Sequence, residues 1–285
     1  MSNLIDIRGL DKTLGDFELQ DISLSLAPGY IMGFVGPNGA GKSTTIKLML
    51  NLLRKQSGDL RLFGLDADKD EAAIKQKIGF VLDDSYYYEG MTVGQVGWLL
   101  SGFYREWDET AFRRYLEKYE LPKKKKVKEL STGMKAKLSM ALALCHHAKL
   151  LILDEPTSGL DPVVRSDILA ELYEVVRDPE CGVFLSTHIT SDLDKVADFV
   201  TFIQKGRITL STSRDEIDEN YALVKGAKKD LPQAKGFLMR YTETSFGFEG
   251  LTCQAAALRK QGQFLLEKAH IEDILLYLEK GEAVC

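Results

Sequence analysis

The strongest constraint on this chain is a glycine-rich stretch at residues 36–44, which reads Gly-Pro-Asn-Gly-Ala-Gly-Lys-Ser-Thr. It fits the pattern G-x-x-x-x-G-K-[ST], in which glycines let the backbone turn its N–H groups inward around phosphate oxygens. Lys42 would place a positive charge against the β- and γ-phosphates, and the Ser43 hydroxyl would ligate Mg²⁺. The residues expected to contact a nucleotide here are Gly36, Pro37, Asn38, Gly39, Ala40, Gly41, Lys42, Ser43 and Thr44.

The flanking sequence supports this interpretation. Residues 31–35 read as a short apolar strand, and residues 44–53 carry apolar side chains at helical spacing. The loop would then open onto a helix N-terminus, whose dipole favours anions. A glycine-rich turn that carries Lys-Ser by chance is the alternative, but the strand–loop–helix context favours a nucleoside triphosphate site.

Composition limits the remaining classes of protein. The chain has 285 residues, enough for one large domain or two modest ones, and its net charge of −5 gives no general attraction to nucleic acid. The four cysteines are scattered, which favours reduced thiols in a reducing compartment. Residues 1–8 do not resemble a signal peptide and no apolar run approaches 20 residues. We therefore expect a cytoplasmic protein that does not itself span a membrane and has no nucleic-acid partner.

The first 130 residues contain a strand-rich part followed by a helical part. Residues 4–35 read as short strands separated by turns, and further strands are expected at 59–64 and 78–82. Residues 92–119 read as helical. The aromatic residues around that stretch favour core packing or a partner surface over a cofactor site. They are Tyr86, Tyr87, Tyr88, Trp98 and Trp107. A lysine run at residues 123–126, with Lys128, favours a solvated loop over contact with a membrane or nucleic acid.

Two carboxylates end an uninterrupted apolar strand at residues 150–155. Such a strand belongs in the middle of a covered, mostly parallel sheet, and ligands bind at the C-terminal ends of its strands. Asp154 is therefore expected on the Mg²⁺ side of the site, with Glu155 as the candidate base for water. A second strand at 183–186 would deliver His188 to the same edge, where a γ-phosphate contact is favoured over a structural role.

The order of these features resembles the ATPase subunit of an ABC transporter, over about residues 4–208. The resemblance also uses the Leu-Ser-Thr-Gly-Met segment at 130–134, which precedes a helical stretch, and Asp161, which reads as an N-cap followed by proline. It implies an α/β fold: a P-loop NTPase core with a mostly parallel sheet, an antiparallel β lobe, a helical subdomain and a small α+β C-terminal domain. It also implies a head-to-tail dimer with ATP between the two chains, either a homodimer or a heterodimer.

The same resemblance implies roles for individual residues. Lys42 would hold the phosphates, Glu155 would polarise the attacking water, and His188 would bridge the γ-phosphate and the dimer interface. Asp161 would link the two sites. A signature segment would reach the γ-phosphate of the partner's ATP from the start of the following helix. Its residues are Ser131, Thr132, Gly133 and Met134.

The chain departs from the family pattern in three places. Asp83 stands where the family has a glutamine, and its carboxylate is expected to serve as a Mg²⁺ ligand. The signature reads Ser-Thr-Gly-Met where Ser-Gly-Gly-Gln is common. The position that usually carries an aromatic residue against adenine is Leu14, and Phe17 is the expected substitute.

Two domains are expected, an ABC ATPase domain at 1–208 and an accessory α+β domain at 209–285. Within the first, a helical subdomain at about 84–130 would dock a cytoplasmic helix of a separate permease subunit, with Trp98 and the three tyrosines as candidate docking groups. The second is similar to the tails of ABC-2-type exporter ATPases, including those of bacitracin-resistance and phenol-soluble-modulin exporters. A dimer-stabilising or regulatory role is expected for it.

Three functions follow as hypotheses. The first is an ATPase on the inner face of the cell membrane that drives an exporter through a separate permease, with amphipathic or antimicrobial peptides as cargo. The second is a soluble ABC ATPase acting on the ribosome or DNA, but the chain lacks the duplicated nucleotide domains or long coiled-coil insertions of those relatives. The third is a nucleotide-binding regulator that barely hydrolyses, which the presence of Glu155 and His188 disfavours.

Overall fold

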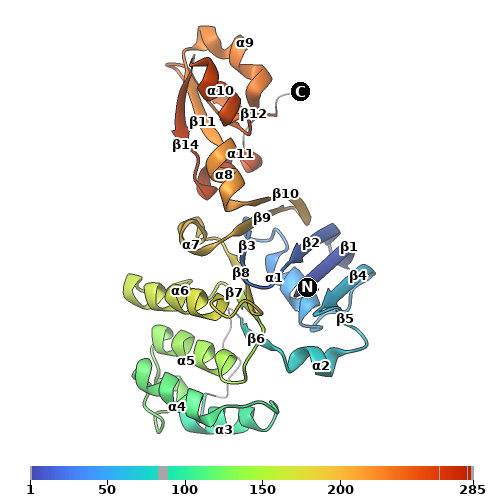
Figure 1. The fold of residues 1–285 in the computed structure, drawn as a ribbon, viewed down its shortest axis with the longest axis vertical. Coiled ribbons are helices and arrows are strands. Elements are labelled where there is room, and N and C mark those ends of the chain that lie inside the picture. The colour runs from blue at the N-terminus through green and yellow to red at the C-terminus, as the bar shows by residue number, and fades with distance from the viewer. Residues whose placement is uncertain (1, 83–88, 263, 281, 284–285) are drawn as a thin grey trace.

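The computed structural model describes residues 2–82, 89–262, 264–280 and 282–283. The molecule is elongated (Figure 1): a helical layer lies at one end, two sheets lie in the middle, and an α/β unit, coloured orange to red, lies at the other end. Asp83 and the three tyrosines at 86–88 lie outside the described residues.

An antiparallel lobe is built from the N-terminal part of the chain. Its strands follow the order β2-β1-β4-β5. They are β1 (Ile5–Leu14), β2 (Phe17–Leu26), β4 (Ser57–Leu62) and β5 (Leu65–Asp66). The first two strands run for ten residues each and are longer than the short strands expected, because register shifts in β1 absorb the interruptions in its alternating pattern. The expected β-rich lobe is confirmed.

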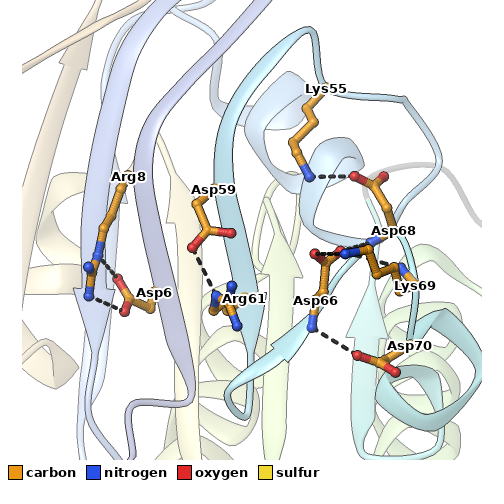
Figure 2. A network of polar contacts seen from close by, with 9 residues as sticks. All are labelled: Asp6, Arg8, Lys55, Asp59, Arg61, Asp66, Asp68, Lys69 and Asp70. Carbon is orange, nitrogen blue, oxygen red and sulfur yellow. Dashed lines mark hydrogen bonds and ion pairs between the residues drawn. The ribbon is translucent and has the colours of Figure 1, made fainter.

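Complementary charges lie across the exposed side of this lobe (Figure 2). Asp6 pairs in register with Arg61, and Arg8 pairs with Asp59. Each arginine also bonds the aspartate two residues before it on its own strand, Arg8 at 2.7 Å and Arg61 at 2.8 Å. Pairs this exposed add little stability, but a two-residue slip would place Asp6 opposite Asp59 or Arg8 opposite Arg61, so they favour this register. The neighbouring turn carries further polar contacts among Lys55, Asp66, Asp68, Lys69 and Asp70.

The central sheet has the order β10-β9-β3-β8-β7-β6. Its strands are β3 (Ile31–Val35), β6 (Ile78–Val81), β7 (Leu150–Asp154), β8 (Gly182–Thr187), β9 (Phe199–Gln204) and β10 (Arg207–Ser213). All neighbours are parallel except β9 and β10. Every residue of β3, β7 and β8 is buried, so both faces of the sheet are covered. The expected mostly parallel sheet is confirmed.

Two hydrophobic clusters cover the two faces of this sheet. One joins it to the antiparallel lobe and to α1 (Lys42–Met49). The other joins it to α5 (Thr132–Leu144), α6 (Pro162–Val176) and α7 (Thr190–Val196). A short helix, α2 (Glu71–Lys75), precedes β6. Helix α1 begins two residues earlier than the helix expected at 44–53, and it ends four residues earlier.

The helical layer contains two helices where one helical stretch was expected at 92–119. They are α3 (Val93–Ser101) and α4 (Glu109–Lys118), with the 3₁₀ turn η1 (Val127–Glu129) after them. Gly102 ends α3, and the Asp108 side chain caps α4 by accepting from two backbone N–H groups, so the chain turns between them. Both helices pack on α5 through a separate cluster. Trp107 packs against that cluster and Trp98 is exposed.

The expected solvated lysine loop is confirmed, since the lysines of 123–128 are exposed apart from half-buried Lys125.

The C-terminal unit is an antiparallel sheet with helices, as expected. The sheet order is β14-β11-β13-β12-β15. Its strands are β11 (Ala222–Gly226), β12 (Leu238–Glu243), β13 (Phe248–Thr252), β14 (Leu265–Lys268) and β15 (Glu282–Ala283). The helices are α8 (Arg214–Asn220), α9 (Leu231–Ala234), α10 (Ala255–Gln261) and α11 (Ile271–Lys280), with η2 (Lys228–Asp230) and η3 (Lys235–Phe237). The expected boundary after residue 208 falls inside β10, because that strand pairs with β9 of the central sheet.

This C-terminal unit packs on the rest of the chain through α7. Helix α11 lies against α7, and buried Ile271 and Ile274 belong to the same hydrophobic cluster as Leu193 and Val196. Asp194 on α7 also accepts from the Arg214 guanidinium at 2.5 Å. The unit therefore shares a core with the central sheet. Among the helices of the described part of the chain, none combines the length and apolar character needed to cross a bilayer.

Candidate nucleotide-binding site

The glycine-rich loop joins the end of β3 to the start of α1, and its glycines are required for different physical reasons. Gly39 and Gly41 have φ values of 78° and 115°, in the left-handed region that favours glycine. Gly36 is needed for close packing, since a Cβ there would lie 2.1 Å from the backbone oxygen of Ile203 on β9. The loop is thus held against a neighbouring strand at its first residue.

Lys42 occupies the inside of this loop. Its side chain is buried, and Nζ donates to the carbonyl oxygens of Gly36 at 2.7 Å and Pro37 at 3.3 Å. The same ammonium lies 3.7 Å from Oε1 of Glu155. A pocket of about 350 Å³ adjoins it. The pocket is lined by Phe17, Asn38, Gly39, Gly41, Lys42, Ser43, Thr44 and Glu155. Among the described residues, Phe17 reaches the pocket lining and Leu14 does not.

Strand ends bring the acidic residues and the histidine together. Asp154 ends β7, is buried, and accepts from the Ser186 hydroxyl at 2.9 Å. Glu155 follows with a φ of 52°, and its Oε2 accepts from the backbone N–H of His188 at 3.2 Å. The His188 ring Nδ1 lies 2.7 Å from the same oxygen. One contiguous group of charged side chains therefore runs from the loop lysine to the histidine.

The signature segment lies at the start of α5. The Ser131 hydroxyl accepts from the N–H of Met134 at 3.2 Å, so it caps the helix, and Thr132 and Gly133 form the first turn. These residues line a second pocket of about 520 Å³. Its lining also includes Tyr119, Glu120, Lys137, Gly159, Leu160, Asp161 and Val164. Among the described residues, none lines both this pocket and the first.

Asp161 caps α6 as expected. Its Oδ1 accepts from the N–H groups of Val163 at 3.0 Å and Val164 at 3.1 Å, and Pro162 is the first helical residue. The structure therefore groups Asp161 with the signature segment and separates both from Lys42 and Glu155.

The donor set fits a hard cation bound together with phosphates. Among the described residues, no three His, Cys, Asp or Glu side chains form a group that could hold a metal ion on their own. Mg²⁺ usually takes one or two protein ligands and completes its shell with water and substrate phosphates, so a hydroxyl at Ser43 and a carboxylate at Asp154 suit it. Asp83, the third expected ligand, lies outside the described residues.

Sequence reasoning missed two features. One is a buried polar network of Thr157, Arg165 and Asp192 beside the site. The other is an apolar groove of about 750 Å³. Its lining residues are Lys47, Leu50, Leu52, Ala72, Lys75, Gln76, Ile78, Phe80, Leu82, Leu100, Phe103 and Tyr104. No local sequence pattern marked the groove, because Phe80 lies in an apolar run and its 42% exposure is a property of the folded chain.

The sheet order, the glycine loop and the carboxylates at the strand ends define a nucleotide-binding protein of the P-loop class. The family model described as ABC transporter matches residues 19–158. The ABC transporter ATP-binding protein YtrB of Bacillus subtilis (strain 168) is 31% identical over 225 residues, which cover 79% of this chain and 77% of that protein. The bacitracin transport ATP-binding protein BcrA of Bacillus licheniformis is 33% identical, covering 73% of this chain and 69% of that protein.

Solved structures agree with this match. An ATP-binding subunit of an ABC transporter superposes with a TM-score of 0.70 at 25% identity, over 75% of this chain and 91% of that one. The cbiO1 protein from Clostridium perfringens, described as part of the transporter complex cbiONQ, gives a TM-score of 0.65 at 25% identity, over 76% and 91%. The chain belongs to the ABC transporter family. It is an ATP-binding subunit that hydrolyses ATP to power transport.

Proposed function

We propose that this chain powers an exporter by closing with a second nucleotide-binding domain over ATP and opening after hydrolysis. The observation that supports this is the division of the site residues between two pockets that share no described lining residue. Lys42 and Glu155 line one, and the signature segment with Asp161 lines the other. Each pocket is half of a site, so two chains in head-to-tail contact complete two sites.

In this proposal the chemistry is positioning and electrostatics around the γ-phosphate. Lys42 and the loop N–H groups hold the phosphates, while Glu155 orients water and accepts its proton. His188, 2.7 Å from Glu155, holds that carboxylate and contacts the γ-phosphate. Ser131 and Gly133 of the second chain approach the same phosphate from the N-terminus of α5, which favours negative charge. Closure excludes water, so these charges act more strongly.

Mg²⁺ bound with ATP would be held by the Ser43 hydroxyl and the Asp154 carboxylate, and it would offset phosphate charge during transfer. Phe17, which lines the first pocket, is the aromatic side chain available to the adenine ring. Both roles are part of the same proposal.

The apolar groove is the proposed docking site for the separate permease. It lies where the residues of α1, α2 and β6 meet the end of α3. Phe103 and Leu52, which are 64% and 54% exposed, border it. An amphipathic cytoplasmic helix of the permease suits a surface of this chemistry. Docking there would hold the chain on the inner face of the cell membrane. Peptide antibiotics are the proposed class of cargo, because this chain is similar to the bacitracin transport ATP-binding protein BcrA and to the lantibiotic transport ATP-binding protein SrtF of Streptococcus pyogenes.

Replacing the proposed base tests the mechanism. Glu155→Gln keeps the side-chain shape but cannot accept a proton, so turnover should fall at least about 100-fold while ATP binding persists. The variant should accumulate as an ATP-bound dimer in light scattering. Glu174→Gln, on the exposed side of α6 where Glu174 pairs with Arg177, is the control and should behave like the wild type. Wild-type turnover in Glu155→Gln, or an ATP-bound species that stays monomeric, would overturn the proposal.

A further inference from the structure

One buried carboxylate beside the catalytic group is not used by the mechanism above. Asp192 on α7 has no exposed surface. Its Oδ2 accepts from the Thr157 hydroxyl at 2.7 Å, and its Oδ1 accepts from Nε of Arg165 at 2.5 Å. Arg165 also donates to the Ser191 hydroxyl at 2.8 Å. Burying a carboxylate is costly unless it is paired and hydrogen-bonded, and here both oxygens have partners.

The partners of Asp192 come from the two other segments that carry site residues. Thr157 lies two residues after Glu155, in the connection between β7 and α6. Arg165 lies in α6, where its backbone N–H donates to the Asp161 oxygen at 3.0 Å. Asp192 itself follows His188 by four residues. One side chain therefore joins the segment after the proposed base, the helix capped by Asp161, and the helix after the histidine.

The backbone at Glu155 needs such support. Its φ of 52° is uncommon for a residue with a side chain and persists where surrounding contacts fix it. The Glu155 N–H donates to the Ser186 oxygen at 2.8 Å on the strand side. On the other side, the anchored hydroxyl of Thr157 limits movement of the chain that leads away from Glu155.

We propose that Asp192 is a positioning residue for hydrolysis. Through Thr157 and Arg165 it keeps the segment of Glu155 and the helix after His188 in fixed relation, so that the carboxylate and the imidazole stay in contact. Asp192 touches neither water nor phosphate. This inference rests on the proposed role of Glu155 as the base. A displacement of about 1 Å in a catalytic group costs about 100-fold in rate, which sets the scale of the expected effect.

The test uses the full chain. Asp192→Asn keeps the size of the side chain but removes the charge that Arg165 faces. We expect kcat for ATP to fall about 10- to 100-fold. KM should change less than about threefold, because the phosphate loop is untouched. Thr157→Val removes the hydroxyl that donates to Asp192 and leaves the bond from Arg165, so it should also lower kcat. It serves as the second variant if Asp192→Asn does not fold, as judged by circular dichroism and thermal melting.

Asp194→Asn is the matched control. Asp194 lies on the same helix but faces Arg214 and His270 of the C-terminal unit, so its loss should leave kcat unchanged. If Asp192→Asn and Asp194→Asn lowered kcat equally, the loss would come from a general weakening of α7, and the inference would be overturned.

A double variant separates positioning from an independent role. If Asp192 acts through Glu155, Asp192→Asn should reduce the residual turnover of Glu155→Gln no further. Additive losses, a folded Asp192→Asn with wild-type kcat, or a rise in KM with unchanged kcat would each overturn the inference. Wild-type turnover in Glu155→Gln alone would instead overturn the proposed base, so the two failures are distinguishable.

Discussion

At the scale of single residues, the proposed catalytic group places a carboxylate between a lysine and a histidine. Lys42 lies 3.7 Å from one oxygen of Glu155, and the His188 ring lies 2.7 Å from the other. A carboxylate between two nitrogen groups is held in one orientation. The carboxylate proposed as the base is therefore oriented by its neighbours on both sides.

A pH-dependent interaction of the antiparallel lobe can be tested at this scale. Ser57 donates to Oδ2 of Asp11 at 2.5 Å, and the N–H of Asp21 donates to Oδ1 at 2.8 Å. These bonds, the serine first, hold the pKa of Asp11 below its usual 3.8. A lowered carboxyl pKa contributes stability above about pH 3.8, and this is lost as the pH falls through the folded-state value. Ser57→Ala should therefore destabilise the protein at neutral pH and by less at an acid pH below 3.8, because the contribution shrinks as the pH falls through the folded-state pKa of Asp11.

Urea unfolding of the wild type and the variant at both pH values measures this. Ser23→Ala is the control, since the Ser23 hydroxyl accepts from the Gly9 N–H and, within the described part of the chain, bonds no carboxylate. Its loss should cost the same at both pH values. If Ser57→Ala lost as much stability at acid pH as at neutral pH, the linkage to Asp11 would be wrong.

Residues of the phosphate loop could be predicted from sequence because their spacing is local. Lys42 and Ser43 follow directly from the glycine pattern and the adjoining strand. Thr157, Arg165 and Asp192 could not be predicted, because the network joins three segments that meet only in the folded chain. A buried aspartate on a short helix has no distinctive local pattern. The roles assigned to the site residues remain predictions.

At the scale of elements, the helical layer depends on its caps. Thr92 caps α3 in a capping box: its hydroxyl accepts from the Gln95 N–H at 3.2 Å, and the Gln95 side chain accepts from the Thr92 N–H at 2.8 Å. Thr92→Ala should lower the free energy of unfolding by about 1 kcal/mol. Thr110→Ala, an exposed change in the first turn of α4, should have little effect. Chemical denaturation compares the two, and equal losses would contradict a capping role.

The proposed permease groove can be tested on one exposed side chain. Phe103→Asp places a charge on its apolar lining, so co-purification with the permease from detergent should fall at least about 10-fold. ATP hydrolysis by the isolated chain should not change, because Phe103 is not part of either nucleotide pocket. Phe246→Asp is the control, since this phenylalanine is also exposed but lies in the C-terminal unit. Equal retention of the permease by both variants would exclude the groove as the docking site.

Elements with strong local patterns were predicted, whereas one strand held mainly by its neighbours was not. The apolar runs that became β3, β7 and β8 were found because all their residues are buried. Strand β13 was missed: it contains Gly250, which weakens strand propensity, and it is held by β11 and β12 on its two sides. The division of one helical stretch into α3 and α4 was also missed, although Gly102 and Asp108 were the available stop and start signals.

At the scale of the whole molecule, the C-terminal unit and the central sheet should unfold together. Ile274 on α11 is fully buried in the hydrophobic cluster that contains α7 and the sheet. Ile274→Ala should cost about 2–5 kcal/mol and lower a single melting transition. Leu276→Ala, on the more exposed side of α11, should cost much less. Calorimetry measures both, and two separate transitions with only one shifted would contradict a shared core.

The domain boundary expected after residue 208 cuts through a β-hairpin of the central sheet. Composition changes near residue 208, but β10 continues to residue 213 as the antiparallel edge of the central sheet. Pairing with β9 is a local hairpin through the two-residue turn Lys205-Gly206, where both residues have positive φ, so this turn was an available signal that the expected boundary overlooked. The division into domains at 1–208 and 209–285 stays a prediction; β10 (Arg207–Ser213) belongs to the central sheet and β11 (Ala222–Gly226) to the C-terminal sheet.

The capping of α6 also bears on how two copies could associate. The cap uses only Oδ1 of Asp161, which receives both backbone N–H groups. A carboxylate has lone pairs on two oxygens, so Oδ2 can accept from a neighbouring protomer while the cap stays intact. Association through this side chain would therefore not fray the first turn of the helix. The affinity between protomers would not be reduced by a cost of local unfolding.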